Sequence, residues 1–286
     1  MRTLLLLAIP ALWAQDADAE RWFALIEEGT FFRERGGFAD SLIAFRKALK
    51  IAEELTESEP LALPSTYANT GSLYLEWKRP GEALLECRKG LPLLRGPARY
   101  ERAAVEGHLH QVCAFSHYWL RDDEAALREM TLALDALRPY AKEIPRVFAQ
   151  ALVSAGAMDY FYGRSVEAEL RFNEVIEMHT AAKHGDTPAL VIAYEGRAAL
   201  LAAKGAHAEA AGLFEQVLAM QGRLYGTLHP RIGPTMAAYA KTLRALKRNK
   251  EAKDYEARAR TLEERFGPDV ADQMISIHGL KSKGGK

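Results

Sequence analysis

Apolar side chains recur along most of this chain at the three-to-four-residue spacing of amphipathic helices. Helix-breaking residues separate these segments, at Pro60, Gly96-Pro97, Pro139, Gly185-Asp186-Thr187-Pro188 and His229-Pro230. Several prolines stand at or just before an expected first helical turn, where a missing amide hydrogen costs little. No run of alternating apolar and polar residues has a useful length for a strand, so the pattern predicts an all-α fold.

The helical pattern repeats. Each repeat has a small anchor residue in its first helix, a glycine or polar residue at +7, a small one at +12, a large one at +16 and a small one at +19. The anchors are Gly29, Gly71, Ala114, Gly156, Ala198 and Ala240, which are 42, 43, 42, 42 and 42 residues apart. Small residues let two antiparallel helices approach closely, and the large residue fills the gap toward the next repeat. The residue at +7 ends the first helix, where Gly36, Gly163 and Gly205 suit a left-handed cap.

These repeats resemble the tetratricopeptide repeat family over about residues 22–266. The stride exceeds the usual 34 residues and is similar to the kinesin-light-chain-type subclass. Asn69-Thr70-Gly71 with Tyr74, and Leu228-His229-Pro230, are close to that subclass, whereas repeat three has Ala114 for glycine. The resemblance implies an α-solenoid, a right-handed superhelix of about six helix–turn–helix repeats. These are expected near 22–55, 64–97, 107–140, 149–182, 191–224 and 233–266.

The two ends of the chain differ from the repeats. Residues 1–19 combine an early arginine, an apolar run from Leu4 to Trp13 and small residues before Glu20, which is typical of a secretory signal peptide. Cleavage is expected after Ala14 or Ala19. The array then covers 20–266, and a C-terminal tail covers 267–286. We therefore expect an exported protein, periplasmic or secreted, without a membrane span in the mature chain.

The composition of the chain restricts the classes of partner and of function. The chain has 286 residues with 38 Lys+Arg, 38 Asp+Glu and 49% hydrophobic residues, so it has no net charge to attract nucleic acid. No nucleophile, zinc-protease or phosphate-loop motif occurs, which argues against an enzyme and against a cofactor.

The resemblance implies that first helices line a concave groove and that their outward positions contact an extended peptide or partner helix. Helical spacing places positions two, five, nine and twelve of each repeat outward, with the anchor at position eight. The candidate groove residues are His108, Gln111, Phe115, Tyr118, Gln150, Val153, Tyr160 and Glu195. Aromatic anchors with a few polar groups suit peptide recognition. The alternative is that Trp119, Phe161 and part of Tyr118 only pack between neighbouring helices.

Two further groups of residues, a possible metal site and a possible disulfide, are explained by helix packing. His110, Cys113 and His117 share one helical face, as zinc or copper ligands would, but these positions normally pack against the second helix. We therefore expect no metal there. Cys87 and Cys113 lie on helices that could be neighbours, and export permits a disulfide. Helix axes about 8–10 Å apart often keep cysteines too far apart to bond, which favours buried free thiols.

The sequence thus predicts an exported, non-catalytic protein-interaction scaffold. A small-ligand or peptide receptor that changes the superhelix, and a self-assembling structural protein, stay open as alternatives.

Overall fold

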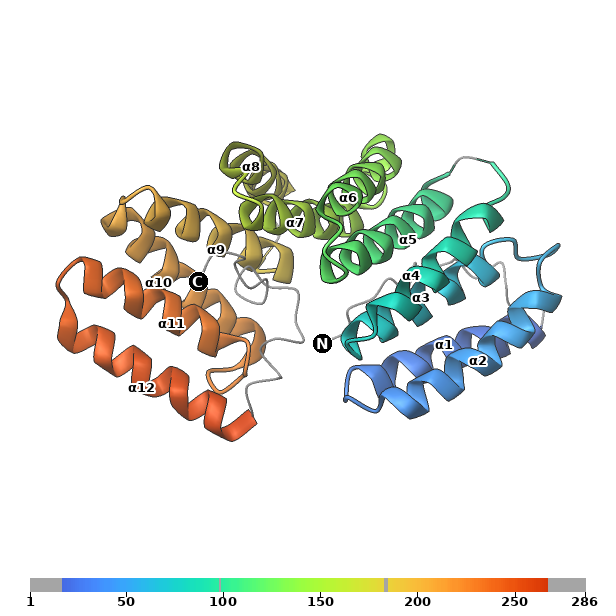
Figure 1. Ribbon diagram of the computed structural model, residues 1–286, viewed down its shortest axis with the longest axis horizontal. Helices are drawn as coiled ribbons and strands as arrows, with labels where there is room; N and C mark the ends of the chain where they lie inside the picture. Colours follow the sequence, from blue (N-terminus) through green and yellow to red (C-terminus); the bar gives the residue numbers. More distant parts are fainter. Residues whose placement is uncertain (1–16, 98, 183–184, 267–286) are drawn as a thin grey trace. The chain divides into compact units, whose positions relative to one another are not determined.

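The computed structural model describes residues 17–97, 99–182 and 185–266 (Figure 1). Within these residues twelve α-helices follow one another as helix–turn–helix hairpins, and no strand occurs, so the predicted all-α class is confirmed. Residues 1–16 of the predicted signal and the whole predicted tail, 267–286, lie outside the described residues.

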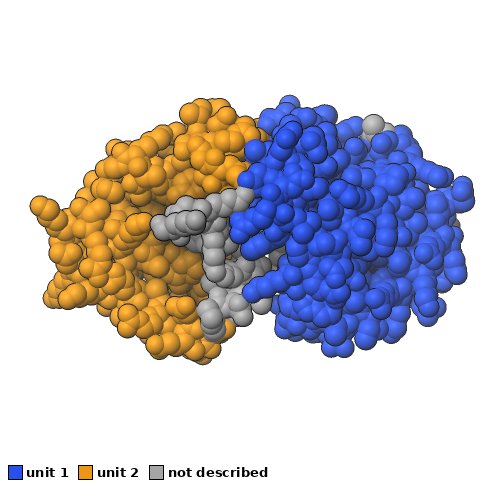
Figure 2. All heavy atoms as spheres, viewed as in Figure 1, with its two compact units in different colours: residues 1–151 blue, residues 152–286 orange. Residues whose placement is uncertain are grey.

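The chain divides into two compact units, Met1–Ala151 and Leu152–Lys286 (Figure 2). The hairpins of unit 1 are α1 (Ala17–Arg33) with α2 (Phe38–Glu54), α3 (Ala62–Glu76) with α4 (Pro80–Gly90), and α5 (Tyr100–Trp119) with α6 (Asp123–Leu137). Short 3-10 turns, η2 (Leu91–Leu93) and η3 (Arg138–Tyr140), prolong α4 and α6. The first helix of the third hairpin begins at Tyr100, seven residues before the expected repeat start at 107.

The remaining helices are α7 (Pro145–Phe161), α8 (Ser165–Ala182), α9 (Pro188–Ala203), α10 (His207–Tyr225), α11 (Ile232–Ala245) and α12 (Asn249–Phe266). The division into units falls within α7, and α8 to α12 belong to unit 2. The helix-breaking segment that ends in Thr187-Pro188 caps the N-terminus of α9. Thr187 Oγ1 accepts a hydrogen bond from Leu190 N at 3.2 Å, and Pro188 occupies the first turn.

Every first helix ends in a left-handed residue at the +7 position. Three of these residues are Gly36, Gly163 and Gly205, with φ of 75°, 75° and 82°. The other three are Lys78, Arg121 and Lys247, with φ of 59°, 68° and 61°. A residue with a Cβ is strained in this conformation, so the tight turn is imposed by the hairpin even where the sequence offers no glycine.

The +16 side chain packs on its own anchor as well as toward the next hairpin. A Cβ on Gly29 would lie 2.4 Å from the ring of Phe45, and one on Gly156 would lie 2.7 Å from the ring of Phe172. The Phe172 ring also contacts the next first helix, where a Cβ on Gly196 would lie 2.3 Å from it. The small anchors are therefore required by close packing within a hairpin, and the large residue joins consecutive hairpins.

Candidate binding surface

The predicted groove residues fall on three first helices. His108, Gln111, Phe115 and Tyr118 lie on α5, Gln150, Val153 and Tyr160 on α7, and Glu195 on α9. Five of the eight are buried, namely Gln111, Phe115, Tyr118, Val153 and Glu195, and the other three are half-buried. The outward positions thus offer less free surface than helical spacing alone indicates, and their role in binding stays a prediction.

In unit 1, outward positions of three successive first helices come together. Ser72 Oγ of α3 and His108 Nε2 of α5 are hydrogen-bonded at 2.8 Å. Arg33 Nε of α1 lies 3.5 Å from a carboxylate oxygen of Glu76 on α3. We call Arg33, Ser72, Glu76 and His108 the first-helix surface of unit 1. Its outermost members in sequence, Arg33 and His108, are 75 positions apart. They come together because hairpin stacking aligns equivalent positions of the repeats.

His108 is neutral at physiological pH. Burial lowers the pKa of its imidazole to about 4, and the positive charge of Arg33 adds to that effect. The centre of the first-helix surface of unit 1 is therefore an uncharged hydroxyl–imidazole pair, with the ion pair of Arg33 and Glu76 beside it.

The two aromatic residues at the end of α5 differ in exposure. Tyr118 is only 3% exposed, whereas Trp119 is 47% exposed. Their ring centroids lie 5.3 Å apart with an interplanar angle of 76°. The buried Tyr118 ring thus supports an exposed Trp119 ring, in the edge-to-face arrangement that aromatic pairs favour. The exposure of Trp119 disagrees with the alternative interpretation, in which its ring only packs between helices.

In unit 2, Glu195 belongs to a buried polar chain. The hydroxyl of Thr235 on α11 donates a hydrogen bond to Glu195 Oε1 on α9. Gln221 Nε2 on α10 in turn donates to Thr235 Oγ1 at 2.9 Å. All three side chains are at most 3% exposed. The chain ties the second helix of one hairpin to the first helices of two hairpins.

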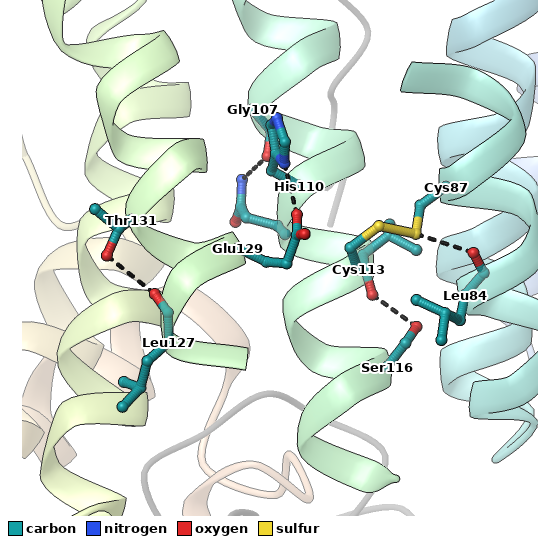
Figure 3. Close-up of polar contacts among 11 residues, drawn as sticks. Leu84, Cys87, Gly107, His110, Cys113, Ser116, Leu127, Glu129 and Thr131 are labelled. Carbon is teal, nitrogen blue, oxygen red and sulfur yellow. Dashed lines mark hydrogen bonds and ion pairs between the residues drawn. A yellow bond between two sulfur atoms is a disulfide. The ribbon is translucent and has the colours of Figure 1, made fainter. Parts of the chain in front are cut away.

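The histidine and cysteine face of α5 is structural (Figure 3). His110 Nδ1 lies 2.7 Å from Glu129 Oε2 on α6, and His117 Nδ1 lies 3.3 Å from Asp122 Oδ2 in the following turn. Cys113 is bonded to Cys87 of α4, with Cα atoms 5.8 Å apart. The expectation of free thiols is therefore wrong, because consecutive helices approach more closely at this point than their axes would indicate. No group of metal-ligating side chains occurs in 17–97, 99–182 or 185–266.

The buried carboxylate of Asp159 on α7 also has a structural partner. Its Oδ2 lies 2.5 Å from Arg171 Nε on α8, and its Oδ1 lies 3.4 Å from Arg164 Nε. Burial raises the pKa of Asp159, whereas the two guanidinium groups act in the opposite direction. This arrangement closes the hairpin of α7 and α8 and brings no nucleophile to the carboxylate.

Residues 189–265 match the family model described as tetratricopeptide repeat. BtubC (BKLC) from P. vanneervenii has a similar structure, with a TM-score of 0.64 at 14% identity over 88% of this chain and 93% of that chain. A Podosopora anserina putative kinesin light chain with nearly identical TPR-like repeats gives 0.54 at 15% identity, over 72% and 98%. Pseudomonas aeruginosa pilF gives 0.55 at 15% identity, over 90% and 96%.

No curated protein matches the sequence significantly. None of the helices among the described residues combines the length and the apolar character needed to cross a membrane. At these identities the similar structures establish the fold alone. Residues 189–265 thus match the tetratricopeptide-repeat model, and the stacked hairpins have the solenoid fold of tetratricopeptide-repeat proteins, including that of a putative kinesin light chain.

Proposed function

We propose that this chain is an exported, non-catalytic scaffold that binds an extended segment or a helix of another protein on its first-helix surfaces. The observation that carries the proposal is the hydrogen bond between Ser72 and His108, at 2.8 Å. It joins outward positions of α3 and α5, so that consecutive hairpins contribute to one surface. A surface built in this way is long enough to read several side chains of a partner segment.

The chemistry of this surface favours a partner with neutral polar and apolar side chains. His108 is kept neutral by burial, and Ser72 is a hydroxyl, so the pair can both donate and accept hydrogen bonds. Trp119 nearby in sequence offers an exposed ring supported by Tyr118. A rigid aromatic ring gives a large contact area at a low cost in conformational entropy.

Two features support export. The first 19 residues have the pattern of a secretory signal, and Cys87 and Cys113 form a disulfide, which persists in oxidising compartments. α1 begins at Ala17, and Ala19 is 1% exposed in the core with Trp22 and Ile26. We propose cleavage after Ala14 rather than Ala19, because that cut leaves α1 whole. Mass spectrometry of the exported protein tests this, and a mature chain beginning at Glu20 would contradict it.

A displayed library of random 16-residue peptides, selected on the purified chain, tests the binding function. We expect enriched peptides that bind the wild type and lose binding to Ser72→Arg, which places a bulky charge on the first-helix surface of unit 1. The matched control is Leu85→Arg, an exposed position on the second helix α4, which should keep binding. Failure to enrich any peptide, or loss of binding only in Leu85→Arg, would refute the proposal.

A further inference from the structure

We infer that the second helices α2 and α4 of unit 1 form a surface that binds anionic phospholipid membranes. This second-helix surface of unit 1 consists of Ile43, Arg46 and Lys47 of α2 and of Leu85, Arg88 and Lys89 of α4. The inference goes beyond the proposed function and does not rest on it, because the first helices contribute no residue to this surface.

The two helices present the same chemistry at the same repeat positions. Each has an aliphatic residue at +14, an arginine at +17 and a lysine at +18 from its anchor glycine. Residues spaced i, i+3 and i+4 share one face of a helix. The residues at +16, Phe45 and Cys87, are buried on the other side, and Figure 3 shows Cys87 directed toward α5, where it is bonded to Cys113. The aliphatic and basic side chains therefore lie on the outward face of α2 and α4.

All six residues of the second-helix surface of unit 1 are exposed. Ile43 is 53% and Leu85 is 57% exposed, so both aliphatic side chains stand largely in water. Hairpin stacking aligns equivalent positions of successive repeats, and the two triplets thus form one row. The row continues onto α6, where Arg128 at +14 and Leu132 at +18 are also exposed.

The positive charges of this surface are mostly unopposed. Over 17–97, 99–182 and 185–266, neither its two arginines nor Lys47 forms an ion pair. Lys89 Nζ lies 2.8 Å from Oε1 of the half-buried Glu86. The exposed carboxylates of α2 lie in its first and last turns, away from the basic positions. The surface therefore has the charge that complements an anionic partner.

The repeat itself does not require these charges. At +17 and +18, α8 has Asn173 and Glu174, α10 has Glu215 and Gln216, and α12 has a single cation, Arg258. Hairpins thus form with neutral or acidic residues at the same positions. The basic character belongs to the second helices of unit 1, and the equal totals of 38 Lys+Arg and 38 Asp+Glu conceal it.

The mixture of side chains favours a membrane over an acidic protein segment. Aliphatic residues among arginines and lysines are typical of helices that lie in the membrane interface. The aliphatic tips enter the boundary between headgroups and acyl chains, while the long basic side chains keep their charges at the lipid phosphates. Because the row crosses neighbouring helices instead of following one groove, it suits an extended surface.

Flotation of the purified chain with lipid vesicles tests the inference. One set of vesicles contains phosphatidylglycerol and phosphatidylcholine, and the other contains phosphatidylcholine alone. We expect the wild type to bind the anionic vesicles only. Raising NaCl from about 0.05 to 0.5 M should release most of the bound protein, because salt screens the attraction between exposed charges and the membrane.

Two triple variants remove the same number of charges from different surfaces. Arg46→Gln/Lys47→Gln/Arg88→Gln should weaken binding to the anionic vesicles at least tenfold. The control Lys250→Gln/Lys253→Gln/Arg260→Gln removes three exposed cations of α12 and should change binding less than twofold. Equal losses in the two variants would mean that net charge alone drives adsorption, and would overturn the inference.

The aliphatic residues are tested separately by Ile43→Ser/Leu85→Ser. We expect at least threefold weaker binding with an unchanged salt dependence, because this variant keeps every charge. Binding equal to that of the wild type would show that neither side chain enters the membrane, which contradicts the inference. Circular dichroism checks that each variant keeps its helical spectrum. Should the triple variant of unit 1 unfold, Arg46→Gln/Lys47→Gln replaces it and should weaken binding at least threefold.

An acidic peptide distinguishes the two kinds of anionic partner. A wild-type chain that binds polyglutamate but not the anionic vesicles would assign the second-helix surface of unit 1 to an acidic protein and overturn the inference. Binding of neither would also overturn it. The outcome of the peptide selection on the first helices is independent of these results, so the proposed function can fail or hold separately.

Discussion

Cys87 and Cys113 are bonded across two consecutive hairpins, with their Cα atoms 5.8 Å apart. In unit 2 the same two repeat positions are held by Phe214 and Tyr239, whose ring centroids lie 6.1 Å apart. The disulfide therefore stands where another hairpin pair has an aromatic contact between its +16 residue and the next first helix. In unit 1 a covalent bond joins α4 to α5 at these positions.

Loss of this bond should destabilise the protein substantially. The disulfide closes a segment with a sequence separation of 26 residues. A loop of that length corresponds to about 3.5 kcal/mol in the chain-entropy model. We expect Cys87→Ala/Cys113→Ala, or the wild type fully reduced, to unfold at a lower urea concentration by about that free energy. The double variant should no longer respond to reductant, and a midpoint equal to that of the oxidised wild type would contradict the assignment.

His108 should make stability depend on pH. Its imidazole pKa is about 4 in the folded protein and about 6.5 in an unfolded chain. Between these values the unfolded state binds a proton that the folded state does not. The neutral imidazole of His108 therefore makes its full contribution to the free energy of unfolding above pH 6.5. This contribution is lost as the pH falls toward 4. Because His108 keeps some exposure to water, we expect the free energy of unfolding to fall by about 2 kcal/mol, which is less than the difference between the two pKa values alone would give.

Urea unfolding of wild type and His108→Gln between pH 7.5 and 4 measures this effect. Other histidines titrate in both proteins, so the difference between the two curves is the relevant quantity. The wild type should lose more stability than the variant as the pH falls. Parallel curves would mean that His108 is not held neutral by its surroundings.

The left-handed position at the end of the first helices gives a stabilising substitution. Lys247 is exposed and has φ of 61°, a conformation that glycine adopts without strain. We expect Lys247→Gly to raise the free energy of unfolding by about 0.5–1 kcal/mol. Gly205→Ala, at the same repeat position with φ of 82°, should lower it by about 1 kcal/mol. The reverse order of the two melting temperatures would show that the turn does not impose this backbone conformation.

The anchor glycines should respond differently from exposed helical glycines. In Gly29→Ala the new Cβ would lie 2.4 Å from the Phe45 ring, and we expect a cost of about 1–3 kcal/mol. Gly212 on α10 has open space around the same atom, so Gly212→Ala should stabilise by up to about 1 kcal/mol. Thermal unfolding of both variants checks the pair. Equal effects would contradict the close packing of hairpins.

The fold could be predicted because it depends on a pattern that the sequence repeats. Small anchors and the +7 turn residue each have a direct steric cause, and Lys78 shows that the turn forms even without glycine. The disulfide could not be predicted, because bonding depends on a Cα separation of 5.8 Å that helix axes alone do not specify. Whether cysteines bond is decided by local approach of the backbones.

The candidate site was harder to predict for a related reason. Helical spacing shows which positions share a face, but not how closely neighbouring first helices cover that face. Gln111, Phe115 and Tyr118 were therefore expected to face a groove and are buried. Trp119, for which packing between helices is the alternative interpretation, has an exposed ring. The hydrogen bond between Gln221 and Thr235 depends on the approach of α10 to α11, and neither residue has a repeat-wide pattern that would reveal it.

The central claim is that first helices, and not second helices, bind the partner segment. A selected peptide with a photoreactive benzophenone at its centre, irradiated with the wild-type chain, tests this most directly when the cross-linked fragments are identified by mass spectrometry. The account predicts cross-links on α3 and α5, or on α9 and α11. Cross-links confined to α2, α4, α6, α8, α10 or α12 would contradict it.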